Sequence, residues 1–303
     1  MNLSNALLRW YKKYGRDLPW RKTRDPYRIL VSEIMLQQTQ VPRVVLFYKK
    51  WLKEFPNWKA LARASNAQVI HAWAGLGYNR RGLMLRDIAR ELSSIKHQIP
   101  KTEEGWRSLK GIGPYTAAAL AVFSLRKRVL PIDTNIRRTA GRILLGKPFP
   151  QPADDDRIRS HASRFTLRVS RFYDIPQALF DLATKICTKT PSCVMCPMRS
   201  TCLAAPKFLS GRVRVPKQMV KKSFENKHRD KPYPDRIYRG RILKVVRESI
   251  RGISVDTLGL KIDPKFNRVQ DQTWLLHMID RMIKDGFLER KKANLIDIFK
   301  NSC

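Results

Sequence analysis

The stretch Gly111-Ile112-Gly113-Pro114-Tyr115-Thr116-Ala117 decides the fold, because a turn with two glycines runs directly into an apolar helix. The glycines let the backbone approach a ligand closely, and the helix that follows directs its free N–H groups at the same place. Such a helix N-terminus favours phosphate. A tight connection, Leu130-Pro131-Ile132-Asp133-Thr134-Asn135, then supplies a carboxylate. We therefore expect a site that holds a phosphate near a carboxylate able to act on the nucleotide.

The chain carries a large excess of positive charge along its whole length. Its 303 residues include 61 Lys and Arg against 25 Asp and Glu, a net charge of +36. This charge favours nucleic acid as the partner, because phosphate neutralisation releases counterions. The length allows two or three domains. The sequence shows no signal-peptide pattern and no long apolar segment that could span a membrane. We therefore expect a cytoplasmic, nucleoid-associated monomer with no membrane partner.

Hydrophobic periodicity predicts a mainly α fold with a small α+β domain at its C-terminal end. Residues 1–205 show apolar residues at helical spacing, punctuated by Pro and Gly. A basic stretch at 206–232 lacks this spacing and is expected to be a linker. In residues 233–303 helices precede Gly286 and a final apolar strand. Helices followed by a hairpin are typical of a winged helix.

Four cysteines fall close together as C-x5-C-x2-C-x5-C, at Cys187, Cys193, Cys196 and Cys202. A reducing compartment makes metal binding a better interpretation than disulfides. Zinc sites usually show two close pairs separated by a longer loop. One close pair flanked by two evenly spaced cysteines favours a single bulky 4Fe–4S cluster, and zinc is the alternative.

Several motifs together resemble the helix-hairpin-helix DNA glycosylases, and among them the adenine DNA glycosylases, over about residues 5–205. They are Leu18-Pro19-Trp20-Arg21, the run from Ser32 to Val41, Gly75-Leu76-Gly77-Tyr78, the hairpin 111–117, Asp133-x-Asn135 and the four cysteines. The resemblance implies two helical domains, with DNA bent and one base turned out between them. An iron–sulfur domain would combine 1–21 with 135–205, and a six-helix domain containing the hairpin would span 22–134.

Two carboxyl groups are the expected catalytic residues. Glu33 lies in an apolar run, so burial should raise its pKa and keep a proton available for the leaving base. The resemblance implies the same role, with the base protonated at N7. Asp133 would stabilise the positive charge that develops on the sugar, or trap it. The alternatives are a buried Glu33 that caps a neighbouring helix and an Asp133 that is an N-cap, which is compatible with catalysis.

Position 115 bears on the type of reaction. In relatives that also cut the strand, such as endonuclease III, a lysine stands here and forms a Schiff base with the sugar. Tyr115 cannot do so, which predicts an enzyme that only removes the base, with the hydroxyl bonded near the sugar or Asp133. Asn135 would orient Asp133 or the sugar backbone. Lys110, Gly111 and Gly113 would contact phosphate, and a solvated Lys110 is the alternative.

A flipped base leaves a gap that side chains must fill, since opening the duplex costs a few kcal/mol. By resemblance Gln38 and Tyr78 form this wedge, with Leu76 beside them. The alternative for Gln38 is an exposed helix end, and the alternative for Tyr78 is ordinary core packing. Trp20 and Arg21 would line the base pocket. Asp181 would accept from an exocyclic amine of the base, or be a helix-surface acid.

Three departures from the family pattern limit the match. The first cysteine gap is one residue short, and Asn79 stands where a second tyrosine is usual. Residues 233–303 do not resemble the β-rich domain that reads 8-oxoguanine. We expect them to add DNA affinity, and packing or partner binding is the alternative. The leading hypothesis is a monofunctional glycosylase that removes adenine opposite 8-oxoguanine or guanine from mismatched double-stranded DNA. A mismatch thymine or uracil glycosylase is the alternative, and a non-catalytic iron–sulfur DNA-binding regulator is a third.

Overall fold

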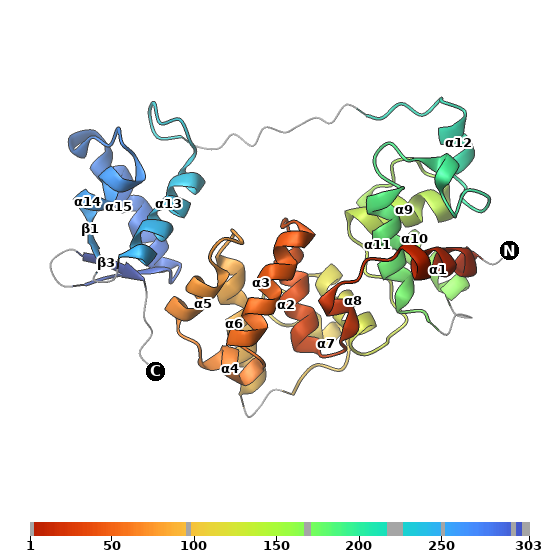
Figure 1. Ribbon diagram of the computed structural model, residues 1–303, viewed down its shortest axis with the longest axis horizontal. Helices are drawn as coiled ribbons and strands as arrows, with labels where there is room; N and C mark the ends of the chain where they lie inside the picture. The colour runs from red at the N-terminus through yellow and green to blue at the C-terminus, as the bar shows by residue number, and fades with distance from the viewer. Residues whose placement is uncertain are drawn as a thin grey trace. The chain divides into compact units, whose positions relative to one another are not determined.

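The computed structural model describes residues 3–94, 98–166, 171–216, 227–249, 252–291 and 295–298. They are mainly helical and fall into two compact units, whose helices are labelled in Figure 1. Unit 1 combines Met1–Gln37 with Ile99–Gln218, and unit 2 combines Gln38–Gln98 with Met219–Cys303. This division differs from the expected domain boundaries, because α2 and the hairpin helices, expected in the 22–134 domain, are grouped with residues 134–218, and Val122 of the second hairpin helix shares an apolar core with Ile136, Ile143 and Leu179. None of the described helices has the length and apolar character needed to cross a membrane.

Unit 1 is built from short helices around an apolar core. The elements are α1 (Leu3–Tyr14), η1 (Pro19–Lys22), α2 (Pro26–Leu36), α7 (Glu103–Arg107), α8 (Pro114–Phe123), α9 (Thr134–Leu145), η2 (Pro152–Asp154), α10 (Asp155–Thr166), α11 (Asp174–Lys185), η3 (Cys193–Met195) and α12 (Ala205–Leu209). Helix α9 packs against α10 and α11, and α8 packs against α2 and α7. All side chains from Thr116 to Val122 are buried, and their small size allows this close packing.

Unit 2 contains four helices and a C-terminal module. The helices are α3 (Val41–Glu54), α4 (Trp58–Arg63), α5 (Asn66–Trp73) and α6 (Arg80–Ser93). The indole rings of Trp51 and Trp73 meet edge to face in its core. Parts of the expected linker belong to the two units: Ala205–Leu209 form α12, and Lys231 is buried in the module. Residues 217–226 lie outside the described residues.

The C-terminal module has the element order of a winged helix. It comprises α13 (Asp235–Glu248), β1 (Ile253–Ser254), α14 (Val255–Ile262), α15 (Arg268–Lys284), β2 (Leu288–Arg290) and β3 (Leu295–Ile298). Its antiparallel sheet has the order β1-β3-β2, with Ile253 opposite Ile296 and Leu288 opposite Ile298. The three helices pack on one another and α13 packs against β3.

Candidate active site and cysteine site

Glu33 is held inside unit 1 by helix α2. The helix begins at Pro26, and the Asp25 side chain caps it by accepting from the Tyr27 N–H (2.9 Å). Every residue from Ile29 to Met35 is buried, and Glu33 is only 7% exposed. Burial is the main cause that raises the pKa of Glu33 to about 7. The carboxyl group can therefore hold a proton near neutral pH, as its apolar surroundings in the sequence predicted.

Tyr115, in the first turn of α8, is the hydrogen-bond partner of Glu33. This bond lowers the pKa of Glu33, whereas the nearby charge of Asp133 raises it and that of Arg21 lowers it. Burial, followed by the charges of Glu33 and Asp133, raises the pKa of Tyr115 well above its ordinary value. The phenol therefore stays neutral and can donate. The partner in the structure is Glu33, whereas a bond near the sugar or to Asp133 was expected from the sequence.

Asp133 is both the N-cap of α9 and a neighbour of Glu33. Its Oδ1 accepts from the backbone N–H groups of Asn135 (2.9 Å) and Ile136 (2.7 Å), and its Oδ2 accepts from Asn135 Nδ2 (2.9 Å). Arg138 Nη2 in turn donates to Asn135 Oδ1 (3.1 Å). The carboxylate is thus fixed at a helix N-terminus, where negative charge is stabilised.

Asp181 has a different position from the one expected. It is completely buried, and its two oxygens accept from Arg21 Nη1 and Nη2 (2.8 and 2.9 Å) and from Arg16 N and Nε (2.8 and 2.6 Å). The prediction that Asp181 contacts the base is therefore wrong, because both oxygens are occupied by arginines. Burial raises the pKa of Asp181, but the bonds and charges of Arg21 and Arg16 outweigh this and lower it. Arg16 gave no signal in the sequence.

Arg21, thus fixed, is a cation whose charge acts on Glu33. Its side chain is largely buried, and its guanidinium also donates to the Arg16 carbonyl (3.0 Å). Trp20, in the same short turn η1, is buried too. Glu33, Tyr115, Asp133, Arg21 and their supports all belong to unit 1. The arrangement pairs a protonatable carboxyl group with a second carboxylate, as required of an acid and a charge stabiliser.

The glycine hairpin between α7 and α8 is at the surface of unit 1. Gly111 has a φ of +93°, which favours glycine, and Gly113 is the N-cap of α8. A Cβ added at Gly113 would meet nothing within 4 Å, so a ligand can approach the backbone there. Lys110, Gly111 and Gly113 are all exposed.

The expected wedge residues belong to unit 2, and two of them are exposed in left-handed backbone conformations. Gln38 has a φ of +56° and Tyr78 a φ of +48°, and Tyr78 is 62% exposed. Exposure of an aromatic ring argues against ordinary core packing. Leu76 is buried instead, with 6% of its surface exposed, so its contact with DNA stays a prediction.

Arg81 supports the Tyr78 loop and was missed in the sequence. Its guanidinium lies 5.4 Å from the Trp73 ring centroid and 5.5 Å from that of Tyr78. Its Nη2 donates to the Gly77 carbonyl (3.1 Å), which also accepts from Trp73 Nε1 (3.0 Å). These contacts hold Tyr78 in its exposed position.

The four cysteines line one cavity between α9, α11 and α12. All four are free thiols. Burial, with smaller contributions from the neighbouring thiols, raises the pKa of Cys196 to about 12. No three His, Cys, Asp or Glu side chains among the described residues are grouped to hold a single metal ion. The thiols thus surround a shared space rather than converge on one point.

Arg142 is the main cation at the cysteine cavity, and the sequence gave no hint of it. It is fully buried, and its Nη1 lies 3.4 Å from Cys187 Sγ and donates to the Thr188 carbonyl (2.5 Å). Its other nitrogens donate to the carbonyls of Pro148 (2.8 Å) and Lys189 (3.0 Å). A buried guanidinium fits a site that carries negative charge.

Comparisons with known proteins agree with this geometry. Residues 31–162 match the HhH-GPD superfamily of base excision DNA repair proteins. The adenine DNA glycosylase of Mycolicibacterium smegmatis is 31% identical over 94% of this chain and 92% of its own length. That of Mycobacterium tuberculosis is 39% identical over 63% of this chain, and the human one is 34% identical over 66%. The match spans 64% and 38% of the lengths of these last two proteins.

Solved structures confirm the helix-hairpin-helix fold. A thermostable thymine-DNA glycosylase aligns with a TM-score of 0.61 at 26% identity, over 68% of this chain and 95% of its own. A trapped endonuclease III–DNA covalent intermediate aligns with a TM-score of 0.53 at 14% identity, over 69% of this chain and 95% of its own. At that identity the likeness supports the fold alone.

Proposed function

This chain belongs to the adenine DNA glycosylase family, and on that premise we propose that it hydrolyses the N-glycosidic bond of adenine opposite 8-oxoguanine or guanine in mismatched duplex DNA. The product is an abasic site. The observation that carries the proposal is the buried Glu33, whose pKa of about 7 keeps a proton available beside Tyr115 and close to the charge of Asp133.

The chemistry divides between two carboxyl groups. Glu33 gives its proton to the base, so the base leaves as a neutral molecule when the C–N bond breaks and takes the bonding electrons. Asp133, fixed as the cap of α9, stabilises the oxocarbenium charge left on the sugar. Water then adds to the sugar and returns a proton to Glu33. The chain Arg138–Asn135–Asp133 keeps the second carboxylate in place.

Tyr115 supports a reaction that stops at the abasic site. A lysine at this position would attack the sugar and open a route to strand cleavage, whereas a neutral phenol lacks a nucleophilic amine. The Tyr115 hydroxyl instead regulates the proton on Glu33 through their hydrogen bond. The strand therefore stays intact until alkali is added.

DNA contacts are proposed at two exposed places. The N–H groups at the start of α8, with Lys110, suit a backbone phosphate. Gln38 and the exposed ring of Tyr78 suit the gap that a flipped adenine leaves, since an amide and an aromatic ring both stack.

Cys187, Cys193, Cys196 and Cys202 fit a 4Fe–4S cluster. Four thiols around one cavity and a buried Arg142 match a bulky group with net negative charge better than a single ion. Such a cluster would hold together the segment after α11, and no catalytic role is assigned to it. Four irons and four sulfides per chain would support the assignment, and one zinc would overturn it.

A panel of duplexes tests the function. Duplexes with A opposite 8-oxoguanine, A opposite G, T opposite G, and U opposite G are incubated with the protein and then treated with alkali. We expect scission only at adenine and only after alkali. Scission at thymine or uracil alone would favour the alternative suggested by the thymine-DNA glycosylase structure, and no scission would favour a regulator. Scission without alkali would contradict the role of Tyr115.

Asp133→Asn separates catalysis from helix capping. Asparagine caps a helix about as well as aspartate, so folding should be kept while the charge is lost. We expect turnover to fall by about 10²-fold or more, as when an electrostatic stabiliser is removed, with binding to mismatched DNA retained. Asp25→Asn, at the cap of α2, is the matched control and should stay active. Full activity of Asp133→Asn would leave Asp133 as a cap alone.

A further inference from the structure

Helix α15 of the C-terminal module has an exposed face that the proposed excision chemistry does not use. Over its first ten residues the exposed side chains are Arg268, Val269, Gln270, Thr273 and His277, and none is acidic. Val269 is 93% exposed, although it is apolar. In proteins with this element order, the helix at this place enters the major groove of DNA.

Basic side chains surround the start of this face. Lys261, at the end of α14, and Lys265, in the turn before α15, are both exposed. Arg229 reaches the same place from the segment before α13, because its Nη1 donates to Gln270 Oε1. Arg268 is also exposed and pairs with Asp256 (3.1 Å). Four cations from separate segments therefore meet at one end of α15.

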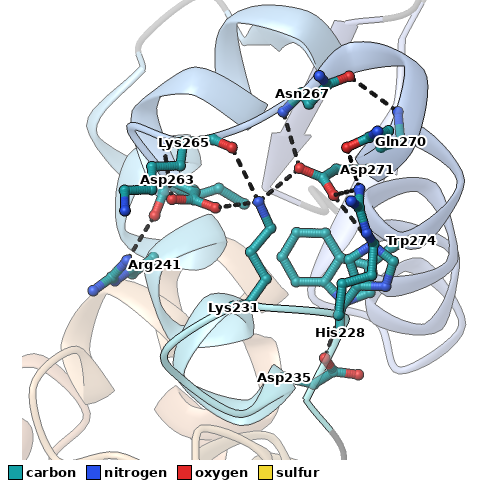
Figure 2. Close-up of polar contacts among 12 residues, drawn as sticks. His228, Lys231, Asp235, Arg241, Asp263, Lys265, Asn267, Gln270, Asp271 and Trp274 are labelled. Carbon is teal, nitrogen blue, oxygen red and sulfur yellow. Dashed lines mark hydrogen bonds and ion pairs between the residues drawn. The ribbon is translucent and has the colours of Figure 1, made fainter.

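Two of the acidic residues near this end, Asp263 and Asp271, are paired inside the module, whereas Asp256 pairs with Arg268 on its surface. Figure 2 shows Lys231 between Asp263 and Asp271, at 2.7 and 2.6 Å from their carboxylate oxygens. All three side chains are buried, and Asp271 also bonds to His228 (3.1 Å), whose ring stacks on Trp274. Asp271 Oδ1 also lies 3.7 Å from Arg229 Nη1, so it offsets part of that charge. Because Asp263 and Asp271 are buried, they leave the exposed Lys261 and Lys265 facing solvent.

We propose that the exposed face of α15 binds the major groove of double-stranded DNA. Lys261, Lys265 and Arg229 would contact phosphates on either side of the groove, and Gln270 and Thr273 would meet base edges. Val269 would make an apolar contact, of the kind that a thymine methyl group offers. The module would thus add affinity for double-stranded DNA that does not depend on a mismatch. This inference extends the proposed function without depending on base excision.

Val269→Glu in the full chain gives the sharpest test. An acid in the first turn of a helix stabilises it, so the melting temperature should hold or rise. Binding to an undamaged duplex should weaken by about tenfold, because the new charge would face phosphates. Ile237→Glu is the matched control, since Ile237 is an apolar residue, 36% exposed, in the first turn of α13. It should leave binding unchanged.

Equal losses in the two variants would overturn the proposal, because they would reflect charge in general rather than this face. Unchanged duplex affinity in Val269→Glu would also overturn the proposal, and would favour a protein partner for this face. As a second measurement, Lys261→Ala with Lys265→Ala should reduce the slope of log affinity against log salt by about two, one per phosphate contact. Lys244→Ala, on α13, should not change it. Because the duplex has no mismatch, these results stand whether or not adenine is excised.

Discussion

Glu33 and Tyr115 illustrate what one residue reveals in the sequence and what it does not. The apolar run around Glu33 was enough to predict its burial and its raised pKa, because burial of a helix follows from local pattern. The hydrogen bond to Tyr115 could not be predicted, because it depends on how α2 and α8 meet. Asp181 was misinterpreted for the same reason: its arginine partners come from a distant segment.

The pH dependence of excision follows from the Glu33 proton. Glu33 must be protonated to act, so the single-turnover rate should fall as the pH rises through about 7. Tyr115→Phe removes a hydrogen bond that lowers this pKa, so the alkaline limb should move to higher pH. Rates at saturating protein over a pH series would measure this. If the alkaline limb of the pH–rate profile does not move in Tyr115→Phe, the Tyr115 hydrogen bond does not set the pKa of Glu33. Glu33→Gln is the control and should be inactive at every pH.

The same proton affects stability with a defined sign. Because the pKa of Glu33 is raised by folding, the folded protein binds this proton more tightly than the unfolded chain does. The stability that this contributes is complete below the ordinary value of 4.5 and is lost as the pH rises through about 7. Burial of Glu33 is therefore a cost at neutral pH, which is common at functional sites.

At the scale of elements, the helices could be predicted from the sequence, but the arginines that fix them to distant segments could not. The turn Gly111–Gly113 and the helix after it, the cap of α9 and the final strand all follow from local sequence. Arg81, Arg138 and Arg142 were not singled out in the sequence, yet each is held against backbone carbonyls. Periodicity does not distinguish such arginines from solvated ones, because the difference lies in their distant partners.

Lys231 is expected to stabilise the C-terminal module. Burial lowers its pKa, but its bonds to Asp263 and Asp271 outweigh this and raise it. Lys231→Met would remove the buried cation that Asp263 and Asp271 share, which costs about 3–5 kcal/mol. Asp271 would keep its contacts with His228 and Arg229. Chemical denaturation that follows the module should detect this loss. Lys244→Met, an exposed lysine of α13, should change the stability by less than about 0.5 kcal/mol.

A second variant checks that charge, and not packing, is the cause. Lys231→Met combined with Asp271→Asn should recover part of the loss, since one unpaired charge is then removed. The pKa of Asp271 is lowered by its Asn267, Lys231 and His228 partners, although burial raises it. Its contribution is present above the pKa of the unfolded chain and is lost as the pH falls through the lower folded value. No recovery in the double variant would argue against the ion pair.

At the scale of the molecule, hydrophobic periodicity predicted the mainly helical fold, which the comparisons confirm. The division into units was not predictable, because it depends on α8 sharing a core with α9 and α11 rather than on any break in the sequence. Similarly, the net charge of +36 indicated a nucleic-acid partner but did not identify which lysines and arginines would contact it.

That overall charge leads to a final prediction that separates binding from chemistry. Salt competes with phosphate contacts, so the affinity for duplex DNA should fall steeply with salt, by about 10³-fold between low and moderate concentration for six contacts. Excision depends on Glu33, which is buried and little screened. The single-turnover rate at saturating protein should therefore change less than about threefold over the same range, a small effect beside the binding loss. A rate that falls in parallel with affinity would show that the chemistry itself relies on exposed cations, and would contradict a buried acid as its source.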